Sequence, residues 1–360
     1  MEMNLNNIVV SVVGARPHFV KAFPLVQQMN RLSTRHFIIH TGQHYDSNMS
    51  ALFFEQFEMP TPDVNLNVGS GTHAEQTAQI MVGVEKIVCD LRPKAVVVFG
   101  DTNSTLAATL AAAKHYFLVV HVEAGVRCFN RRMPEEINRI LIDHASDYLI
   151  CPSELAERNL RREGVTEGVL NLGDFMYDSF LIAQAGAMKR EGILRSHGVE
   201  PGKYILSTIH REASTENPQR LALILKMLGQ LGEPVILPMH PRTRNCLRDI
   251  GFAPKERGLL KIIDPVGYLD MLQLLLNARK VITDSGGVQK EAYWAGVPCI
   301  TMMNETTWSE TVEVGWNVLV GLNQDLIYSA VRSPIPTGER PEVYGPPGAA
   351  RRMVEALGWD

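Results

Sequence analysis

The feature that most constrains the fold is an alternation of short apolar runs with helical patterns along the chain. The runs are rich in valine, isoleucine and leucine. We expect strands at residues 8–13, 37–40, 95–99, 117–120, 148–151, 169–172, 204–209, 234–237, 260–263, 299–303 and 318–320. Short strands that alternate with helices predict parallel sheets covered by helices on both faces. Because the pattern runs through both halves, it predicts two doubly wound α/β sheets.

The chain length supports two domains rather than one. A sequence of 360 residues exceeds the size at which a single hydrophobic core usually stops growing. Its 45% hydrophobic and 21% charged content is typical of a globular protein. We expect helices at residues 72–91, 105–115, 176–196, 218–231 and 349–357.

The composition argues against several classes of protein. A formal net charge of −4 without a basic block argues against a nucleic-acid partner. No apolar stretch approaches the ~18 residues that span a membrane, and no signal peptide is apparent. Five scattered cysteines indicate reduced thiols rather than a disulfide framework or a zinc site. We therefore expect a cytoplasmic protein without a membrane span.

Polar residues and glycines gather directly after the expected strands. They are Gly14, Asp101, Glu123, His210, His240 and Ser285. In open parallel sheets, ligands bind at the carboxyl ends of the strands. Two such edges that face each other would form an interdomain cleft for a ligand. The two histidines could equally be hydrogen-bonded structural residues.

Residues 283–298 have the pattern of a strand, a polar turn, a short helix and a following strand. Gly286 and Gly287 let the backbone approach a ligand closely, and the first amides of the helix suit an anion. Ser285 adds a hydroxyl donor, and Glu291 can accept hydrogen bonds from a ribose diol. These features indicate a nucleotide diphosphate, although a turn with two glycines also occurs without any ligand.

Charged residues of the first half have ordinary roles as well as chemical ones. Arg16 follows the first strand, and Lys21 lies about one turn into the next helix. Asp101 can cap a helix, and Glu135 begins a helix whose dipole favours an acid. Arg139 could form a surface ion pair. The residues alone leave these alternatives open.

Six motifs occur in a fixed order across nearly the whole chain. They are Gly14-Ala-Arg-Pro-His-Phe-Val-Lys, Gly100-Asp-Thr-Asn-Ser, His121-Val-Glu-Ala-Gly, Pro134-Glu-Glu-Ile-Asn-Arg, His210-Arg-Glu and Asp284-Ser-Gly-Gly-Val-Gln-Lys-Glu. Together they resemble the non-hydrolysing UDP-N-acetylglucosamine 2-epimerase family. The resemblance implies the glycosyltransferase-B type fold of two Rossmann-like domains. It places residues 1–172 plus 346–360 in the first domain and residues 173–345 in a UDP-binding domain.

The resemblance also implies a reaction, with neither NAD nor a metal. An isomerase of this family interconverts UDP-GlcNAc and UDP-ManNAc. UDP leaves carbon 1 while the proton on carbon 2 is abstracted, which gives a 2-acetamidoglucal, and UDP then adds back with carbon 2 inverted. Such chemistry needs donors for the departing diphosphate and acid/base groups at the sugar. A homodimer is a further expectation from the family.

The matching motif positions imply roles for individual residues. Those expected to bind the nucleotide or its diphosphate are Arg16, His210, Arg211, His240, Tyr268, Ser285, Gly286, Gly287 and Glu291. Asp101, Glu123 and Glu135 are expected as the carboxylates at the sugar, with Lys21 and Arg139 near them. His210, when protonated, would offset charge on departing UDP. Which carboxylate is the base and which is the acid stays open.

Three other functions compete with this interpretation. Some motifs also resemble relatives that act on UDP-2,3-diacetamido-glucuronic acid, whose extra carboxylate could bind Arg127, Arg131 or Arg132. A glycosyltransferase of the same fold would need an acceptor site, whereas three carboxylates after strands suit proton transfer better. A nucleotide-sugar sensor would bind UDP without turnover.

One departure from the family concerns regulation. Many bacterial members have a second glutamine three residues after the position of Gln43, in an allosteric UDP-GlcNAc site, whereas this chain has Asp46. We therefore expect hyperbolic dependence of the initial rate on UDP-GlcNAc concentration. A sigmoidal rate curve would contradict this expectation.

Overall fold

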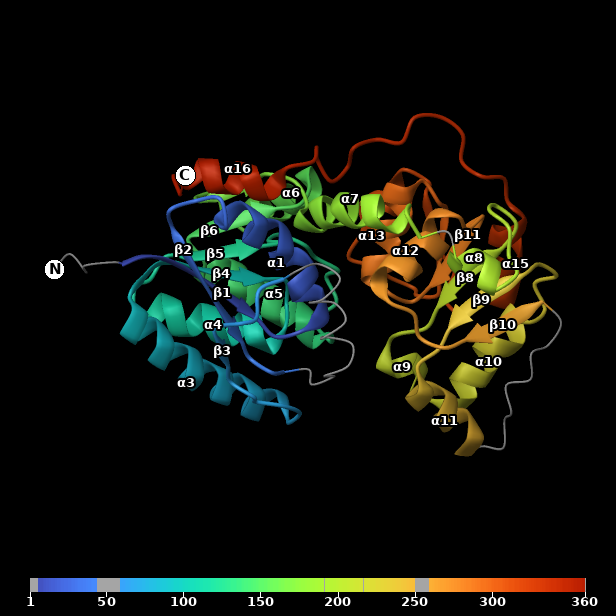
Figure 1. Ribbon diagram of the computed structural model, residues 1–360, viewed down its shortest axis with the longest axis horizontal. Coiled ribbons are helices and arrows are strands. Elements are labelled where there is room, and N and C mark those ends of the chain that lie inside the picture. The colour runs from blue at the N-terminus through green and yellow to red at the C-terminus, as the bar shows by residue number, and fades with distance from the viewer. Residues whose placement is uncertain (1–5, 44–58, 191, 216, 250–258, 360) are drawn as a thin grey trace. The chain divides into compact units, whose positions relative to one another are not determined.

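The computed structural model describes residues 6–43, 59–190, 192–215, 217–249 and 259–359 (Figure 1). The chain divides into two compact units. Unit 1 comprises Met1–Leu181 and Glu342–Asp360, and unit 2 comprises Ile182–Pro341. Each unit contains one parallel sheet, so the prediction of two parallel-sheet α/β domains is confirmed.

The sheet of unit 1 has seven strands in the order β3-β2-β1-β4-β5-β6-β7. Its strands are β1 (Asn6–Val13), β2 (Arg35–His40), β3 (Val64–Asn65), β4 (Pro93–Phe99), β5 (Val119–Val122), β6 (Tyr148–Cys151) and β7 (Val169–Asn171). The helices are α1 (Arg16–Met29), α3 (His73–Leu91), α4 (Asn103–Lys114), α5 (Pro134–Ala145), α6 (Glu154–Arg162) and α16 (Ala349–Ala356), and α7 (Phe175–Ala187) continues into unit 2.

The sheet of unit 2 has six strands in the order β10-β9-β8-β11-β12-β13. Its strands are β8 (Ile205–Thr208), β9 (Val235–Pro238), β10 (Leu260–Ile263), β11 (Lys280–Thr283), β12 (Cys299–Thr301) and β13 (Asn317–Leu319). The helices are α8 (Gly192–Ser196), α9 (Glu212–Thr215), α10 (Pro218–Leu228), α11 (Pro241–Asp249), α12 (Tyr268–Leu276), α13 (Gly286–Ala295), α14 (Ser309–Glu313) and α15 (Gln324–Arg332).

The strand order reverses once in each sheet. In unit 1 the reversal lies between β1 and β4, and in unit 2 it lies between β8 and β11. The loops after these strands therefore diverge at the carboxyl edge, where open parallel sheets bind ligands. Gly14 follows β1, Asp101 follows β4, His210 follows β8 and Ser285 follows β11. The sequence motifs thus lie at the two topological switch points.

Helix α3 shows how local sequence builds the core of unit 1. Thr72 and Glu75 form a capping box, in which each side chain bonds to the backbone amide of the other residue. Ile80, Val84 and Val88 follow at intervals of four residues and are fully buried. They pack on the sheet with the other aliphatic side chains of the unit 1 core. Helix formation at the predicted residues therefore follows from both a cap and an apolar stripe.

Two elements differ from the sequence prediction. The strand expected at residues 117–120 is β5, Val119–Val122, so His121 lies inside a buried strand rather than after its end. The helix expected at residues 176–196 is divided into α7 and α8. The apolar run predicts that a strand is present here. The pairing of β5 with β4 decides at which residue that strand begins.

The end of the chain belongs to unit 1. Helix α16 packs with α1, and Arg352 donates two hydrogen bonds to the carbonyl of Leu172. Asp178 of α7 accepts from the amides of Gly348 and Ala350 at the start of α16. These bonds hold the final helix on unit 1 (Figure 1).

Two further properties bear on the composition. All five cysteines are free thiols. Among the helices that the structure describes, none is both long and apolar enough to cross a lipid bilayer.

The pKa of His36 generates a prediction about stability. Burial lowers this pKa from 6.5 to about 4, although Asp63 opposes the shift. A base with a lowered folded-state pKa binds its proton more readily when unfolded. Its contribution to the free energy of unfolding is therefore present above pH 6.5 and lost as the pH falls toward 4. At pH 5 we expect a loss of about 2 kcal/mol relative to pH 7.5.

Urea unfolding at both pH values should show a smaller pH dependence for His36→Gln than for the wild type. His144→Gln is the matched control, because His144 is exposed on α5. An equal pH dependence for His36→Gln and the wild type would show that His36 does not supply this contribution.

Candidate active site

The turn after β4 brings together a lysine and a carboxylate. Lys21 of α1 donates to Glu123 Oε1 at 2.6 Å, and both side chains are more than nine-tenths buried. Gly100 lies beside this pair with φ +64°, and a Cβ there would come within 2.9 Å of Lys21 Nζ. Glycine is favoured at this position because of its left-handed conformation, and a Cβ would require Lys21 Nζ to shift. Arg16 is the first residue of the same helix.

The backbone of Glu123 is in the left-handed region, with φ +78°. Its amide and that of Ala124 both donate to the carbonyl of Ile150 at 3.1 Å. A residue with a Cβ is disfavoured in this region, and such residues cluster at functional sites. The surrounding bonds hold Glu123 where its carboxylate meets Lys21.

A second ion pair lies on the other side of the same turn. Arg139 of α5 bonds to Asp101, and its Nε donates to Glu136 Oε2 at 2.9 Å. Asn138 also donates to the carbonyl of Asp101 at 2.9 Å. Burial lowers the pKa of Arg139, but the carboxylates of Asp101 and Glu136 raise it by more. Asp101 keeps 28% of its side chain exposed, so it is accessible while held in place.

The two acids at the start of α5 lie in different environments. Glu135, which the resemblance implied as a sugar-site carboxylate, is exposed, whereas Glu136 is buried. Glu136 accepts from the amides of Cys128 and Phe129 at 3.1 and 2.7 Å, and it pairs with Arg139. Burial raises the pKa of Glu136, but these donors outweigh burial and lower it. Glu136 thus fixes the loop before α5.

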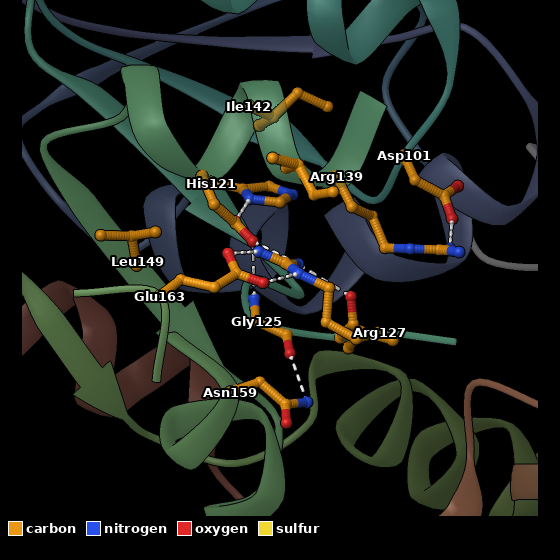
Figure 2. A network of polar contacts seen from close by, with 12 residues as sticks. Asp101, His121, Gly125, Arg127, Arg139, Ile142, Leu149, Asn159 and Glu163 are labelled. Atoms are coloured by element: carbon orange, nitrogen blue, oxygen red, sulfur yellow. Dashed lines mark hydrogen bonds and ion pairs between the residues drawn. The ribbon is translucent and has the colours of Figure 1, made fainter. Parts of the chain in front are cut away.

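A buried cluster of charges lies behind these turns (Figure 2). Arg127 pairs with Asp143 at 2.7 Å and with Glu163 at 2.8 Å. Its guanidinium is 1% exposed, so Arg127 is not available to a substrate carboxylate. Arg131 and Arg132 are exposed.

The turn after β1 packs tightly against α4. A Cβ on Gly14 would lie 2.1 Å from Ser104 Oγ and 2.4 Å from Thr41 Oγ1. Gln43 Oε1 accepts from the Ser104 amide at 3.0 Å and from its hydroxyl at 2.5 Å, which satisfies an amide at the start of α4. Asp46 lies outside the described residues.

In unit 2, Asp284 connects the turns after β8 and β11. It is buried, and its Oδ1 accepts from the amide of His210 at 2.7 Å. Its Oδ2 accepts from the amide of Arg211 at 3.3 Å, and Arg211 Nε donates to the carbonyl of Asp284 at 3.1 Å. The exposed His210 and the half-buried Arg211 are therefore fixed beside Ser285.

Helix α13 begins at this point. Ser285 is its N-cap residue, and the Ser285 side chain makes no capping hydrogen bond. Gly286 and Gly287 form the first turn, and a Cβ on Gly286 would lie 3.0 Å from the indole nitrogen of Trp308. The first amides of α13, together with the dipole of this ten-residue helix, suit an anion.

Further along α13, Glu291 is joined to α12. Tyr268 donates to Glu291 Oε1 at 2.7 Å, and both side chains are buried. This bond orients the carboxylate that the resemblance implied for a ribose. His240 follows β9, the neighbour of β8 in the sheet, and is half-buried.

The structure therefore brings the expected residues together as local pairs within each unit. Sequence reasoning missed Glu136, Asp143 and Asp284. Spacing gave a signal for two of them, because positions 136, 139 and 143 lie on one face of a helix. Asp284 begins one of the six motifs, but the backbone amide that it binds lies in the turn after β8, which the motif does not include.

Comparisons with known proteins agree with these motifs. The family model described as UDP-N-acetylglucosamine 2-epimerase matches residues 27–358. A Methanococcus maripaludis protein named as a homolog of this enzyme is 45% identical, over 97% of this chain and 99% of its own length. A Pseudomonas aeruginosa UDP-2,3-diacetamido-2,3-dideoxy-D-glucuronate 2-epimerase is 42% identical over the same shares of the two chains.

Solved structures show the same fold. The crystal structure of Methanocaldococcus jannaschii UDP-GlcNAc 2-epimerase, in complex with UDP-GlcNAc and UDP, matches with a TM-score of 0.90. It is 39% identical, and the match covers 98% of this chain and 100% of that chain. The glycosyltransferase-B type fold expected from the sequence is thus confirmed.

The backbone of Glu123 yields a prediction about stability. Glu123→Gly should be more stable than Glu123→Ala by about 1 kcal/mol, because alanine keeps the left-handed strain and glycine relieves it. Both variants lose the bond to Lys21, so their difference isolates the backbone term. Urea unfolding measures it.

Glu154 at the exposed start of α6 provides the control pair. There the order should reverse, with glycine less stable than alanine. Equal stability of Glu123→Gly and Glu123→Ala would show that residue 123 carries no strain.

Proposed function

Because this chain belongs to the UDP-N-acetylglucosamine 2-epimerase family, we propose that it interconverts UDP-GlcNAc and UDP-ManNAc. One observation carries the proposal. At the switch point of unit 1, Glu123 and Asp101 are held by the cations Lys21 and Arg139. Such an arrangement suits proton transfer at a sugar better than capture of an acceptor.

Unit 2 is the proposed site for the nucleotide. The amides of Gly286 and Gly287 and the hydroxyl of Ser285 would bind the diphosphate, with His210 and Arg211 supplying side-chain donors. These groups are fixed before the ligand arrives, since Asp284 bonds the backbone of both turns. Donors that are already in place stabilise charge on a leaving group without reorganisation.

Three further residues are proposed to contact the nucleotide. Glu291, oriented by Tyr268, would accept from the ribose hydroxyls. Arg16 would add positive charge at the diphosphate, and His240 would lie at the edge of this site. These assignments rest on the motif positions.

Unit 1 is the proposed site for the chemistry of the sugar. The bond from carbon 1 to oxygen breaks, and its electron pair leaves with UDP. The proton on carbon 2 passes to a carboxylate, and the electrons of that C–H bond form the double bond of the glycal. In the return step a proton reaches carbon 2 from the opposite face while UDP adds to carbon 1.

Glu123 and Asp101 are the proposed proton carriers of this exchange, with Lys21 and Arg139 holding them. Glu135, exposed at the start of α5, stays a proposed third carboxylate. Glu136 takes the positioning role, because both of its oxygens accept hydrogen bonds from the protein.

A diacetamido-glucuronate sugar is the second candidate substrate, because the Pseudomonas aeruginosa relative bears that name. Its additional carboxylate would need a cation that no protein carboxylate already binds. Arg127 does not meet this need, which leaves the exposed Arg131 and Arg132. Turnover of each UDP-sugar, compared between the wild type and Arg131→Ala, separates the two substrates.

We further propose a cytoplasmic homodimer. The five free cysteines support a reducing compartment. Exposed aliphatic side chains on α3 and α5, the two helices that pack against α4, support contact with a second copy; they are Val82, Ile137 and Leu141. A monomeric mass by light scattering would exclude the dimer.

NMR of UDP-GlcNAc in heavy water tests the reaction. The wild type should produce UDP-ManNAc with deuterium at carbon 2, without any acceptor. Glu123→Gln and Asp101→Asn should each lower this exchange by about 100- to 10,000-fold, the range of acid/base contributions. A glycosyltransferase or a sensor would bind UDP without exchange.

A UDP-binding assay distinguishes the roles proposed for the two units. Both unit 1 variants should bind UDP within about twofold of the wild type, whereas Ser285→Ala should weaken binding about tenfold by the loss of a hydrogen bond to a charged group. Glu154→Gln, exposed on α6, is the control for charge loss alone. Wild-type exchange rates in both carboxylate variants would remove Glu123 and Asp101 from the mechanism.

A further inference from the structure

We propose that the buried Asp143 of α5 is a positioning residue that fixes both carboxylate-bearing turns of unit 1 through His121, Gly125 and Arg127. The proposal rests on the function proposed above. It concerns a buried carboxylate that lies in none of the six sequence motifs.

Both oxygens of Asp143 are fully occupied by the protein. Its side chain is 0% exposed. Oδ1 lies 2.6 Å from His121 Nδ1, and Oδ2 accepts from the Gly125 amide at 3.1 Å and pairs with Arg127 at 2.7 Å. Figure 2 labels its partners His121, Gly125 and Arg127, which come from β5 and the loop that follows it. Burial raises the pKa of Asp143, but His121 and Arg127 outweigh burial and lower it.

His121 carries the contact on to the first turn. Its Nε2 lies 2.8 Å from the carbonyl oxygen of Gly100, which can only accept a hydrogen bond. Nε2 therefore bears a proton. Nδ1 lies against the carboxylate of Asp143, so each ring nitrogen has a polar partner. The carbonyl it binds belongs to the residue immediately before Asp101.

The other bonds of Asp143 fix the second turn. Glu123 has its left-handed backbone between His121 and Gly125, and both of these residues are bound to Asp143. Arg127 closes the far end of the segment. One carboxylate thus holds both sides of the residue that meets Lys21.

Helix α5 holds Asp101 twice by this arrangement. Arg139 bonds to the carboxylate of Asp101, and Asp143, four residues later on the same face, acts through His121 on the peptide before it. A buried cluster of ions is weak evidence for stability, since well-packed apolar residues often do as well. Apolar residues could not replace Asp143 in orienting the two turns, because they offer no hydrogen-bond acceptor.

Two substitutions of His121 test the relay. The amide nitrogen of glutamine reaches the place of Nε2, and that of asparagine reaches the place of Nδ1. His121→Gln should keep the bond to Gly100 but lose the bond to Asp143, so the relay predicts about a 100-fold lower kcat. His121→Asn should keep only the bond to Asp143 and lower kcat about 100-fold, the cost of a displacement of about 1 Å. KM and the Kd for UDP should stay within about twofold in both variants.

Asp143→Asn tests the carboxylate itself. The asparagine amide group presents a donor to Gly125 and Arg127, which are donors too. We therefore expect about a 100-fold loss of kcat with KM unchanged. Glu163→Gln is the matched control at the outer end of the cluster, where it contacts Arg127. It should lower the melting temperature and leave kcat unchanged. If Asp143→Asn does not fold, the His121 pair decides.

Three outcomes would overturn the proposal. They are wild-type kcat in His121→Asn, wild-type kcat in His121→Gln, and a parallel loss of kcat in Glu163→Gln. A wild-type protein without exchange at carbon 2 refutes the proposed function instead. In that case long-range ¹H–¹⁵N spectra still decide the contact, since a protonated His121 Nε2 supports the bond to Gly100 and an unprotonated Nε2 contradicts it.

Discussion

A buried carboxylate that accepts hydrogen bonds from the turns after the strands is the interaction on which each switch point depends. In unit 2, Asp284 binds the amides of His210 and Arg211. In unit 1, Asp143 binds His121 and the amide of Gly125. Turns at the carboxyl edge of a parallel sheet have no strand partner beyond that edge. A buried acceptor supplies the missing bonds and thereby gives these turns one conformation.

The cost of this arrangement appears in the backbone and in the glycines. Glu123 keeps a conformation that a Cβ disfavours, and Gly14 and Gly100 lie where a Cβ would collide with a neighbouring side chain. Such positions persist only where surrounding bonds determine them. These strained or crowded positions lie around Lys21 and Ser104. In this part of unit 1 the placement of side chains matters more than local stability.

Much of this architecture could be read from the sequence, because periodicity and strand ends are local signals. Most of the strands, the capped helix α3 and the turn before α13 lie where the patterns predict them, whereas β3 was not expected and β5 begins two residues later than predicted. Side-chain direction is not local in this sense. Glu135 and Glu136 are adjacent acids at a helix start, and only the packing of α5 turns Glu136 inward.

The same limit applies to residues that meet across the sheet. The apolar run 117–120 gives no sign that the strand continues through His121, and the pairing of β5 with β4 extends it. The sequence offered Arg127 as a cation for a substrate. Its two carboxylate partners come from α5 and the end of α6, and no spacing rule connects them.

The distribution of charge gives the proposed reaction its direction. In unit 1 the cations Lys21 and Arg139 are bound to protein carboxylates. In unit 2 the carboxylate of Asp284 is directed into backbone amides, while Ser285 and the start of α13 remain available as donors. A diphosphate is therefore favoured by unit 2, and a proton leaving carbon is favoured by unit 1. Donors fixed in advance for a leaving diphosphate and carboxylates held by cations are the two kinds of group that elimination of UDP requires.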